Sequence, residues 1–204
     1  MADLEVHGPN VRLRLPRETD ARRLFELASD AEVTRFFSWG PYEREEDAAA
    51  WLATLPGRRD SGEALELAIV DREDWLIGII AVLEVSRRDR RAVVGIWLGQ
   101  AYWGTGASAE AEALLAQLVF GPLRMERLAA WVDVRNVRSQ RAFERLGYAR
   151  EGVLRGWHRH GDERRDLVAF AVLREDFEGL VMAAVPVTFH GESPAMFVCE
   201  PRLS

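Results

Sequence analysis

A short glycine-rich segment near the middle of the chain has the composition of a phosphate-binding loop. It reads Gly104-Thr105-Gly106-Ala107-Ser108-Ala109 and lies between a predicted strand that ends at Leu98 and a predicted helix. Successive backbone N–H groups in such a loop, together with the positive end of the helix dipole, form a binding site for a pyrophosphate. A tight strand-to-helix turn without any ligand needs the same glycines, so the segment alone leaves both interpretations open.

The same segment fits the dinucleotide-binding pattern G-x-G-x-x-A, and Asp133 follows at about the distance of a ribose-binding acid. Three features weigh against an NAD site. Residues 100–103 separate the first glycine from its strand, at least three predicted strands precede it, and little chain follows Asp133. An NAD-dependent enzyme is therefore a secondary alternative. A Walker-type nucleotide site is excluded, because no lysine follows the glycines.

A second candidate group begins a predicted helix over residues 136–146. The inward stripe of this helix is apolar except for Ser139, and it continues with Ala142, Phe143 and Leu146. Asn136 has the position of a helix N-cap, and the Ser139 hydroxyl has the spacing to bond back to a helical carbonyl. Both side chains can equally contact a ligand, and the spacing leaves these alternatives open.

Two histidines lie near the end of a predicted strand over residues 148–159. Strand alternation puts Leu154, Gly156, His158 and His160 on one side of the sheet. His158 can accept a proton near neutral pH, although a histidine on a strand that only faces solvent has the same pattern. No third ligand stands at a convincing spacing, so we predict no metal site.

The elements that must position these residues alternate between strands and helices. Apolar and alternating segments predict seven strands, and apolar stripes of helical period predict the helices. Their order predicts an α+β (mixed α/β) fold. The predicted strands are 11–15, 64–70, 75–85, 92–98, 128–134, 148–159 and 164–173, and the predicted helices are 21–28, 31–36, 43–55, one that opens at the glycine segment and ends near Gly121, and 136–146.

Composition narrows the class of protein. The 204 residues are 48% hydrophobic, which is typical of a globular chain and not of a disordered one. The longest strongly apolar run, residues 75–83, is too short for a membrane helix, and the net charge of -6 argues against a general nucleic-acid binder. Cys199 is the only cysteine, which fits a reducing cytoplasm. We therefore expect a cytoplasmic protein with neither a membrane nor a nucleic acid as partner.

Over residues 9–177 the chain resembles the GNAT superfamily of N-acetyltransferases, and within it the RimJ/RimL-like branch of ribosomal-protein N-terminal acetyltransferases. The order and spacing of several motifs carry this resemblance. It implies a splayed, mostly antiparallel seven-stranded sheet flanked by helices, with acyl-CoA between the fourth and fifth strands. The motifs are Leu13-Arg14-Leu15, Val33 to Phe36, Trp39 with Pro41-Tyr42, Trp97-Leu98, Tyr102 to Ala111, Asn136 to Ser139, and Gly147-Tyr148.

The resemblance also implies roles for single residues. Backbone N–H groups of Gly104 to Ala109 would hold the pyrophosphate of acetyl-CoA or of another short acyl-CoA, such as succinyl-CoA. Ser139 would lie near the thioester sulfur as the proton donor, because Phe143 occupies the position where many relatives have a tyrosine. The candidates for the base are His158 and Glu151. The implied cofactor-binding residues are Trp97, Leu98, Trp103, Gly104, Thr105, Gly106, Ala107, Ser108, Ala109, Asn136 and Ser139, and the implied acceptor-site residues are Trp39 and Tyr42.

The implied reaction is the transfer of an acyl group to an amine by direct attack in a ternary complex. A protein α-amine, with a pKa near 8, is far more often neutral at pH 7 than a lysine amine, and so suits a site without a well-placed carboxylate. The alternative from another class is a CoA-binding or regulatory module without catalysis. Residues 1–178 would form the acyltransferase domain. The apolar residues 179–204 would pack on it or on a partner subunit in a homo-oligomer.

Overall fold

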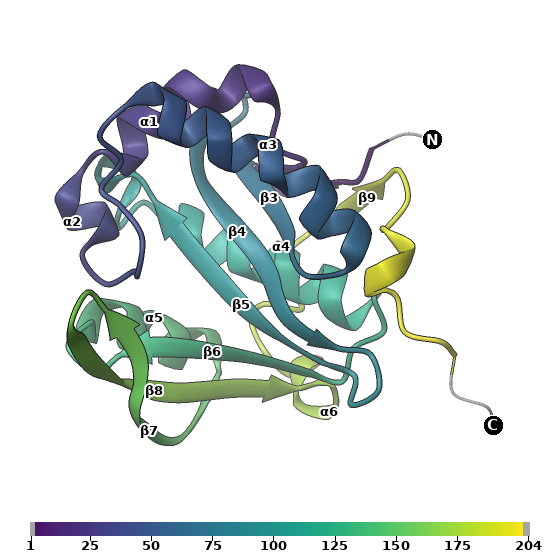
Figure 1. The fold of residues 1–204 in the computed structure, drawn as a ribbon. Helices are drawn as coiled ribbons and strands as arrows, with labels where there is room; N and C mark the ends of the chain where they lie inside the picture. Colours follow the sequence, from purple (N-terminus) through teal and green to yellow (C-terminus); the bar gives the residue numbers. More distant parts are fainter. Residues whose placement is uncertain (1–2, 202–204) are drawn as a thin grey trace.

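A sheet of nine strands runs through the part of the chain that the structure, a computed structural model, describes, which is residues 3–201 (Figure 1). Its strand order is β7-β8-β6-β5-β4-β3-β2-β1-β9. The strands are β1 (Glu5–His7), β2 (Arg12–Arg14), β3 (Leu65–Val70), β4 (Leu76–Ser86), β5 (Arg91–Leu98), β6 (Arg127–Asp133), β7 (Ala149–His160), β8 (Glu163–Leu173) and β9 (Thr188–His190). The α-helices are α1 (Ala21–Ala28), α2 (Ala31–Thr34), α3 (Glu45–Ser61), α4 (Ala107–Phe120), α5 (Val137–Leu146) and α6 (Arg174–Phe177).

The predicted fold class is confirmed, since all seven predicted strands are present in a mixed sheet flanked by helices. Every neighbouring pair is antiparallel except β5 and β6, which are parallel. Two three-residue strands, β1 and β9, add to the seven. Helix α3 also extends past the predicted end at residue 55, through Pro56, to a left-handed Gly62 that caps it.

The two faces of the sheet are covered by different helices. On one face, α1 and α3 pack Leu24, Leu52 and Leu55 against β3 and β4. On the other face lies α4, which is apolar nearly all round and buried along most of its length (Figure 1). A helix of this kind needs apolar partners on more than one side.

The C-terminal segment supplies the second cover for α4. Met182 and Phe197 are fully buried in the same cluster as the helix. The Gln117 side-chain amide donates hydrogen bonds to the carbonyls of Met182 and Val185, at 3.2 and 2.8 Å. Residues 179–201 thus pack on the rest of the chain, and residues 1, 2 and 202–204 lie outside the described part.

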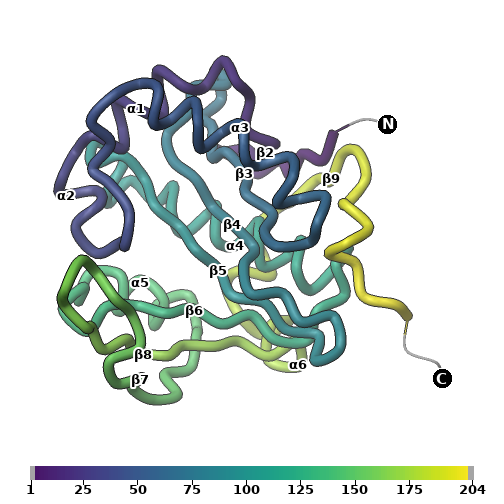
Figure 2. The backbone as a smooth tube through the Cα atoms, in the orientation of Figure 1, coloured from purple at the N-terminus to yellow at the C-terminus, as the bar shows by residue number. Residues whose placement is uncertain are grey.

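Strand β9 brings the end of the chain back to its beginning. It pairs with β1 in antiparallel register, with Phe189 opposite Val6, so that the two strands form one edge of the sheet. Figure 2 shows this end of the tube, drawn in yellow, beside the purple N-terminal part. Among residues 3–201, no helix has both the length and the apolar character needed to cross a bilayer.

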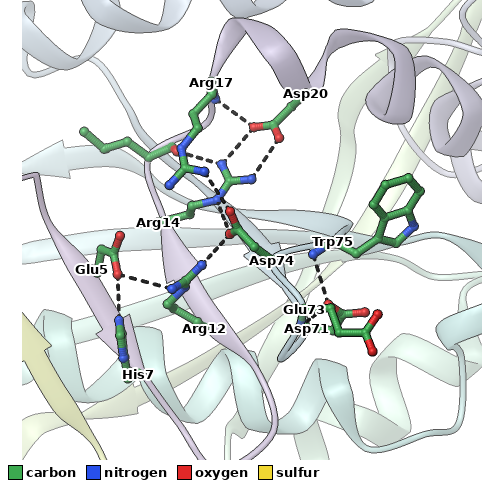
Figure 3. Close-up of polar contacts among 11 residues, drawn as sticks. Glu5, His7, Arg12, Arg14, Arg17, Asp20, Asp71, Glu73, Asp74 and Trp75 are labelled. Carbon is green, nitrogen blue, oxygen red and sulfur yellow. Dashed lines mark hydrogen bonds and ion pairs between the residues drawn. The ribbon is translucent and has the colours of Figure 1, made fainter.

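A network of ion pairs fixes the start of α1 to the sheet (Figure 3). Arg14 of β2 donates two hydrogen bonds of 2.8 Å to the buried Asp20 carboxylate, and its Nε donates to Asp74 in the β3–β4 turn, also at 2.8 Å. Arg17 and Arg12 bind Asp74 as well. Burial raises the pKa of Asp74, but the hydrogen bonds and charges of these arginines outweigh it and lower the pKa to about 2.

The sheet opens between β5 and β6. These strands pair only over residues 91–94 and 127–130, whereas β5 stays paired with β4 and β6 with β8 up to their ends. Beyond this short ladder, residues 95–98 and 131–133 diverge, and the wedge between β5 and β6 is visible in Figure 1. The helices that follow these two strands, α4 and α5, therefore begin at the open end.

Candidate active site

A cavity of about 530 Å³ lies at the open end of the β5–β6 pair. Its walls come from α2 and the turn after it, the end of β5, the glycine segment and first turns of α4, the helix α5, and one residue of the C-terminal segment. The lining residues are Glu32, Val33, Phe36, Phe37, Ile96, Trp97, Leu98, Trp103, Gly104, Gly106, Ser108, Ala109, Glu112, Asn136, Arg138, Ser139, Ala142, Phe143, Arg145, Leu146 and Val181.

The glycine segment has the conformation that its sequence predicts for a loop that approaches a ligand closely. Gly104 and Gly106 have φ of +78° and +94°, a left-handed region that favours glycine, and a Cβ on either would meet no atom within 4 Å. The Thr105 hydroxyl donates to the Tyr102 carbonyl at 2.9 Å and accepts from the Ala107 N–H at 3.3 Å. The first N–H groups of the 14-residue α4 therefore stand at the cavity beside open space, which fits a pyrophosphate.

The end of β5 forms the second wall. Residues 95–98 pair with β4 on one edge only, so their other edge faces the cavity. The Trp103 indole N–H donates to the Leu98 carbonyl at 2.9 Å, and the Arg138 guanidinium lies 3.5 Å from the centre of the Trp103 ring. Burial lowers the pKa of Arg138, against the raising influence of Glu32. This arginine, which the sequence interpretation missed, brings a cation to a cavity that already suits an anion.

Helix α5 presents the predicted polar pair to the same cavity. Asn136 is the N-cap, and its side-chain oxygen accepts from the Ser139 N–H at 3.1 Å. This capping role leaves the Asn136 amide NH₂ as a separate donor. The stripe of Ser139, Ala142, Phe143 and Leu146 lines the cavity as the helical period predicts. Within this stripe, the Ser139 hydroxyl is the polar group among apolar side chains, and Arg138 and Arg145 of the same helix also line the cavity.

A buried carboxyl group that the sequence interpretation missed also lines the cavity. Glu112 of α4 is 1% exposed, and its Oε1 accepts a hydrogen bond from the Tyr148 hydroxyl. Its other oxygen, Oε2, is buried and has no hydrogen-bond partner among the described residues. Burial raises the pKa of Glu112 to about 7, against the lowering effect of the Tyr148 hydrogen bond. Burial and the Glu112 charge in turn raise the pKa of Tyr148.

The remaining candidates lie outside this cavity. Trp39 packs its ring 5.4 Å from that of Trp97 and 5.6 Å from that of Tyr42, so these aromatic rings cover the α1–α3 side of β5. Burial, followed by the charge of Asp47, raises the pKa of Tyr42 to about 12. His158 stands half-buried in β7, opposite Arg165 of β8. The structure thus brings Ser139 to the glycine segment but not His158, and Thr105 and Ala107 shape the loop without lining the cavity.

Within residues 3–201, no group of three or more His, Cys, Asp or Glu side chains is arranged to hold a metal ion. The polar groups of the cavity are instead backbone N–H groups, serine hydroxyls, the Asn136 amide, two arginines and two carboxyl groups. They can hold an anionic ligand and exchange protons with it.

Comparison with known proteins agrees with this arrangement. Residues 10–149 match the acetyltransferase (GNAT) domain family. An uncharacterized N-acetyltransferase, p20 of Bacillus licheniformis, is 27% identical over 175 residues, covering 85% of this chain and 98% of its own. The putative ribosomal N-acetyltransferase YdaF of Bacillus subtilis is 26% identical, covering 83% of this chain and 94% of its own. The spermidine N(1)-acetyltransferase of Escherichia coli K12 is also 26% identical, covering 71% of this chain and 76% of its own.

Solved structures share the fold. A putative acetyltransferase from T. thermophilus superposes with a TM-score of 0.77 at 34% identity, covering 90% of this chain and 95% of its own. The microcin C7 self-immunity acetyltransferase MccE, solved with acetyl-CoA and AMP, superposes with a TM-score of 0.75 at 20% identity, covering 81% of this chain and 93% of its own. The family match includes the glycine segment, which removes the basis for an NAD site. The chain belongs to the GNAT family and is an N-acetyltransferase.

Proposed function

We propose that this enzyme transfers an acetyl group from acetyl-CoA, bound in the β5–β6 cavity, to the α-amine of a protein N-terminus, as in the RimJ/RimL-like branch. The observation that carries the proposal is the cavity itself. It places a left-handed glycine loop at a helix N-terminus beside the free edge of β5 and the hydroxyl of Ser139. The low-pKa α-amine suits a site whose strand β5 carries no carboxylate.

In this proposal the chain holds the co-substrate with groups of three kinds. Backbone N–H groups from Gly104 to Ala109 bind the pyrophosphate, with Arg138 as a nearby cation. The free edge of Trp97 and Leu98 and the Asn136 amide bind the pantetheine arm. Ser139 donates a hydrogen bond to the sulfur. The co-substrate supplies an activated thioester; the protein orients it and excludes water.

The acceptor enters from the opposite side of β5 in this proposal. The rings of Trp39 and Tyr42 pack towards Trp97 there, and Trp97 lines both regions. His158 takes the proton from the amine, directly or through water. The names of two relatives support an amine acceptor of this general kind, because one is called a ribosomal N-acetyltransferase and the other a spermidine N(1)-acetyltransferase. The free Cys199 is compatible with a cytoplasmic setting.

The first experiment measures binding and then turnover. Acetyl-CoA at 100 times its dissociation constant should stabilise the fold by about 2.7 kcal/mol in a thermal-shift assay. Succinyl-CoA and NAD are tested in the same assay, to show which of the three compounds the protein binds. Turnover is then compared on a peptide with a free α-amine, on the same peptide blocked there but with a free lysine, and on spermidine. Binding without turnover on any amine would favour the non-catalytic alternative, and turnover on spermidine alone would contradict the α-amine.

A matched pair of glycine variants tests the binding site. Gly106→Val places a β-branched side chain at φ +94°, over the proposed pyrophosphate position. We expect its acetyl-CoA dissociation constant in calorimetry to rise at least about tenfold. Gly57→Val is the control, because Gly57 lies in α3 and its Cβ also meets no atom within 4 Å. Normal binding by folded Gly106→Val would show that the loop is only a turn.

A further inference from the structure

The Glu112–Tyr148 pair is a buried polar contact beside the cavity whose hydrogen bonding is incomplete. Glu112 is 1% exposed, yet only one of its two oxygens has a hydrogen-bond partner within residues 3–201. A buried polar atom without a partner costs free energy and calls for an explanation such as a ligand. Glu112 belongs to the wall of the cavity together with Ser139 and Phe143, so its buried carboxyl group lies next to the space that a ligand would fill.

The hydrogen-bond inventory is satisfied if the carboxyl group is protonated. The Tyr148 hydroxyl donates to Oε1, so Oε1 acts as the acceptor. A neutral carboxylic acid then carries its proton on Oε2 and is a donor there. Burial, which raises the pKa of Glu112 to about 7, keeps a large fraction of the group in this form at neutral pH. The Oε2–H group is then a donor without an acceptor among the described residues, and a group bound in the cavity can supply one.

We propose, on the basis of the acetyl transfer proposed above, that Glu112 is the catalytic acid that protonates the thiolate of CoA as it departs. The neutral amine forms the N–C bond, the C–S bond breaks, and its electron pair stays on sulfur. Glu112 gives its Oε2 proton to that sulfur, and the extra proton on the amide nitrogen leaves to His158 or solvent. Glu112 regains a proton from solvent after CoA has left, which balances the cycle.

The neighbours of Glu112 fit this division of labour. Tyr148 is a positioning residue, because its hydroxyl holds Oε1 and stabilises the carboxylate that remains after the transfer. Ser139 can donate a hydrogen bond to the sulfur, but an alkyl hydroxyl is a much weaker acid than a thiol, whose pKa is about 8.5. The other charged groups of the cavity are Glu32, Arg138 and Arg145. Phe143, which packs on Tyr148 at a ring distance of 5.0 Å, keeps the pair dry.

The kinetic test compares Glu112→Gln with Glu110→Gln. Glu110 lies on the same helix, but its carboxylate binds Asn10 and the Val11 N–H, so it is a matched control. We expect Glu112→Gln to lower kcat by about 100-fold or more and to abolish the fall in rate above about pH 7, with acetyl-CoA affinity changed less than about twofold. Glu110→Gln should keep both the rate and the pH profile.

Tyr148→Phe provides a second variant if Glu112→Gln fails to fold. The Tyr148 hydrogen bond lowers the pKa of Glu112, so its removal should move the alkaline limb of the rate profile to higher pH. A purely structural role would change stability without moving this limb. An unmoved limb in Tyr148→Phe would therefore count against the proposal.

A spectroscopic test needs no turnover. Infrared difference spectra of the wild type minus Glu112→Gln should show a protonated carboxyl band that disappears around pH 7. CoA should shift this band, and desulfo-CoA should leave it unchanged, because the proposed contact is with sulfur. A shift by both ligands, together with weaker binding by Glu112→Gln, would make Glu112 a pantetheine ligand and overturn the catalytic role. Failure of the wild type to bind acetyl-CoA would instead overturn the proposed function.

Discussion

Two buried carboxyl groups of this protein differ in how completely they are bound. Asp20, at the start of α1, is 7% exposed, and both of its oxygens accept hydrogen bonds, two from Arg14 and one from the Arg17 N–H. Glu112, beside the cavity, is 1% exposed, and in the described part of the chain one donor serves its two oxygens. The carboxylate that joins a helix to the sheet therefore has hydrogen bonds on both oxygens, whereas the carboxyl group beside the proposed ligand has a hydrogen bond on one oxygen.

The largest expected effect comes from breaking the saturated pair. Asp20→Ala leaves the buried Arg14 with Asp74 as its one acidic partner among the residues that the structure describes. Loss of one member of a buried ion pair costs about 3 kcal/mol or more. We expect a loss of this size in the free energy of unfolding, measured by urea denaturation, with acetyl-CoA affinity retained in the folded protein. Asp60→Ala is the control, because the Asp60 side chain is exposed and its Oδ1 lies 3.9 Å from the Arg59 Nε. This variant should change the free energy of unfolding by less than about 0.5 kcal/mol. If Asp20→Ala and Asp60→Ala lowered the free energy of unfolding equally, the buried Asp20 carboxylate would contribute no more to stability than an exposed one.

The half-bound carboxyl group should respond to pH in the opposite sense to an ordinary salt bridge. Folding raises the pKa of Glu112 from 4.5 to about 7, so its contribution to stability is complete below about pH 4.5 and is lost as the pH rises through 7. Glu112→Gln lacks this titration but keeps an oxygen for Tyr148. The unfolding free energy of Glu112→Gln, relative to that of the wild type, should therefore rise by roughly 1–3 kcal/mol between pH 4.5 and pH 8. Parallel pH curves for the two proteins would mean that Glu112 is ionised when buried.

The smallest effect belongs to Asp74, the exposed end of the saturated network. Its pKa of about 2 lies below the ordinary 3.8, so its contribution is complete above about pH 4 and disappears as the pH falls through 2. The Asp74 side chain is 37% exposed, and solvent screening keeps the effect below about 1 kcal/mol. Melting curves of Asp74→Asn should therefore lie below those of the wild type at pH 6 and meet them near pH 2. A constant difference down to pH 2 would assign the loss to packing.

Local pattern was sufficient for most of the fold and for part of the site. The alternation of apolar residues predicted seven strands, and the period of α5 predicted that Ser139, Ala142 and Phe143 share a wall. The strands β1 and β9 are not among the seven predicted strands, because three residues are too few to show a period. The two strands pair with each other from distant parts of the sequence, and β1 also pairs with β2. Helix α3 passes Pro56 because Leu52 and Leu55 pack on the sheet, and a left-handed Gly62 closes its end.

Glu112 shows what the pattern contained and what it could not show. In Ala109-Glu110-Ala111-Glu112-Ala113, both glutamates suggest a solvated helix face. Glu112, however, stands three positions before Leu115 and seven before Val119, which puts it on the buried stripe, and this signal was available. The sequence does not indicate the partner of Glu112, because Tyr148 follows α5 in the chain and meets Glu112 only through tertiary packing.

The pairing of β1 with β9 also has a consequence for synthesis. Val6 and Phe189 meet in register from nearly opposite ends of the sequence, a contact of very high contact order. On the ribosome, β2 to β8 can assemble while this edge still lacks its outermost strand and the apolar side of α4 still lacks Met182 and Phe197. A nascent chain that stalls before residue 188 would therefore expose that surface to other proteins, because part of the segment that covers it is made only after β8.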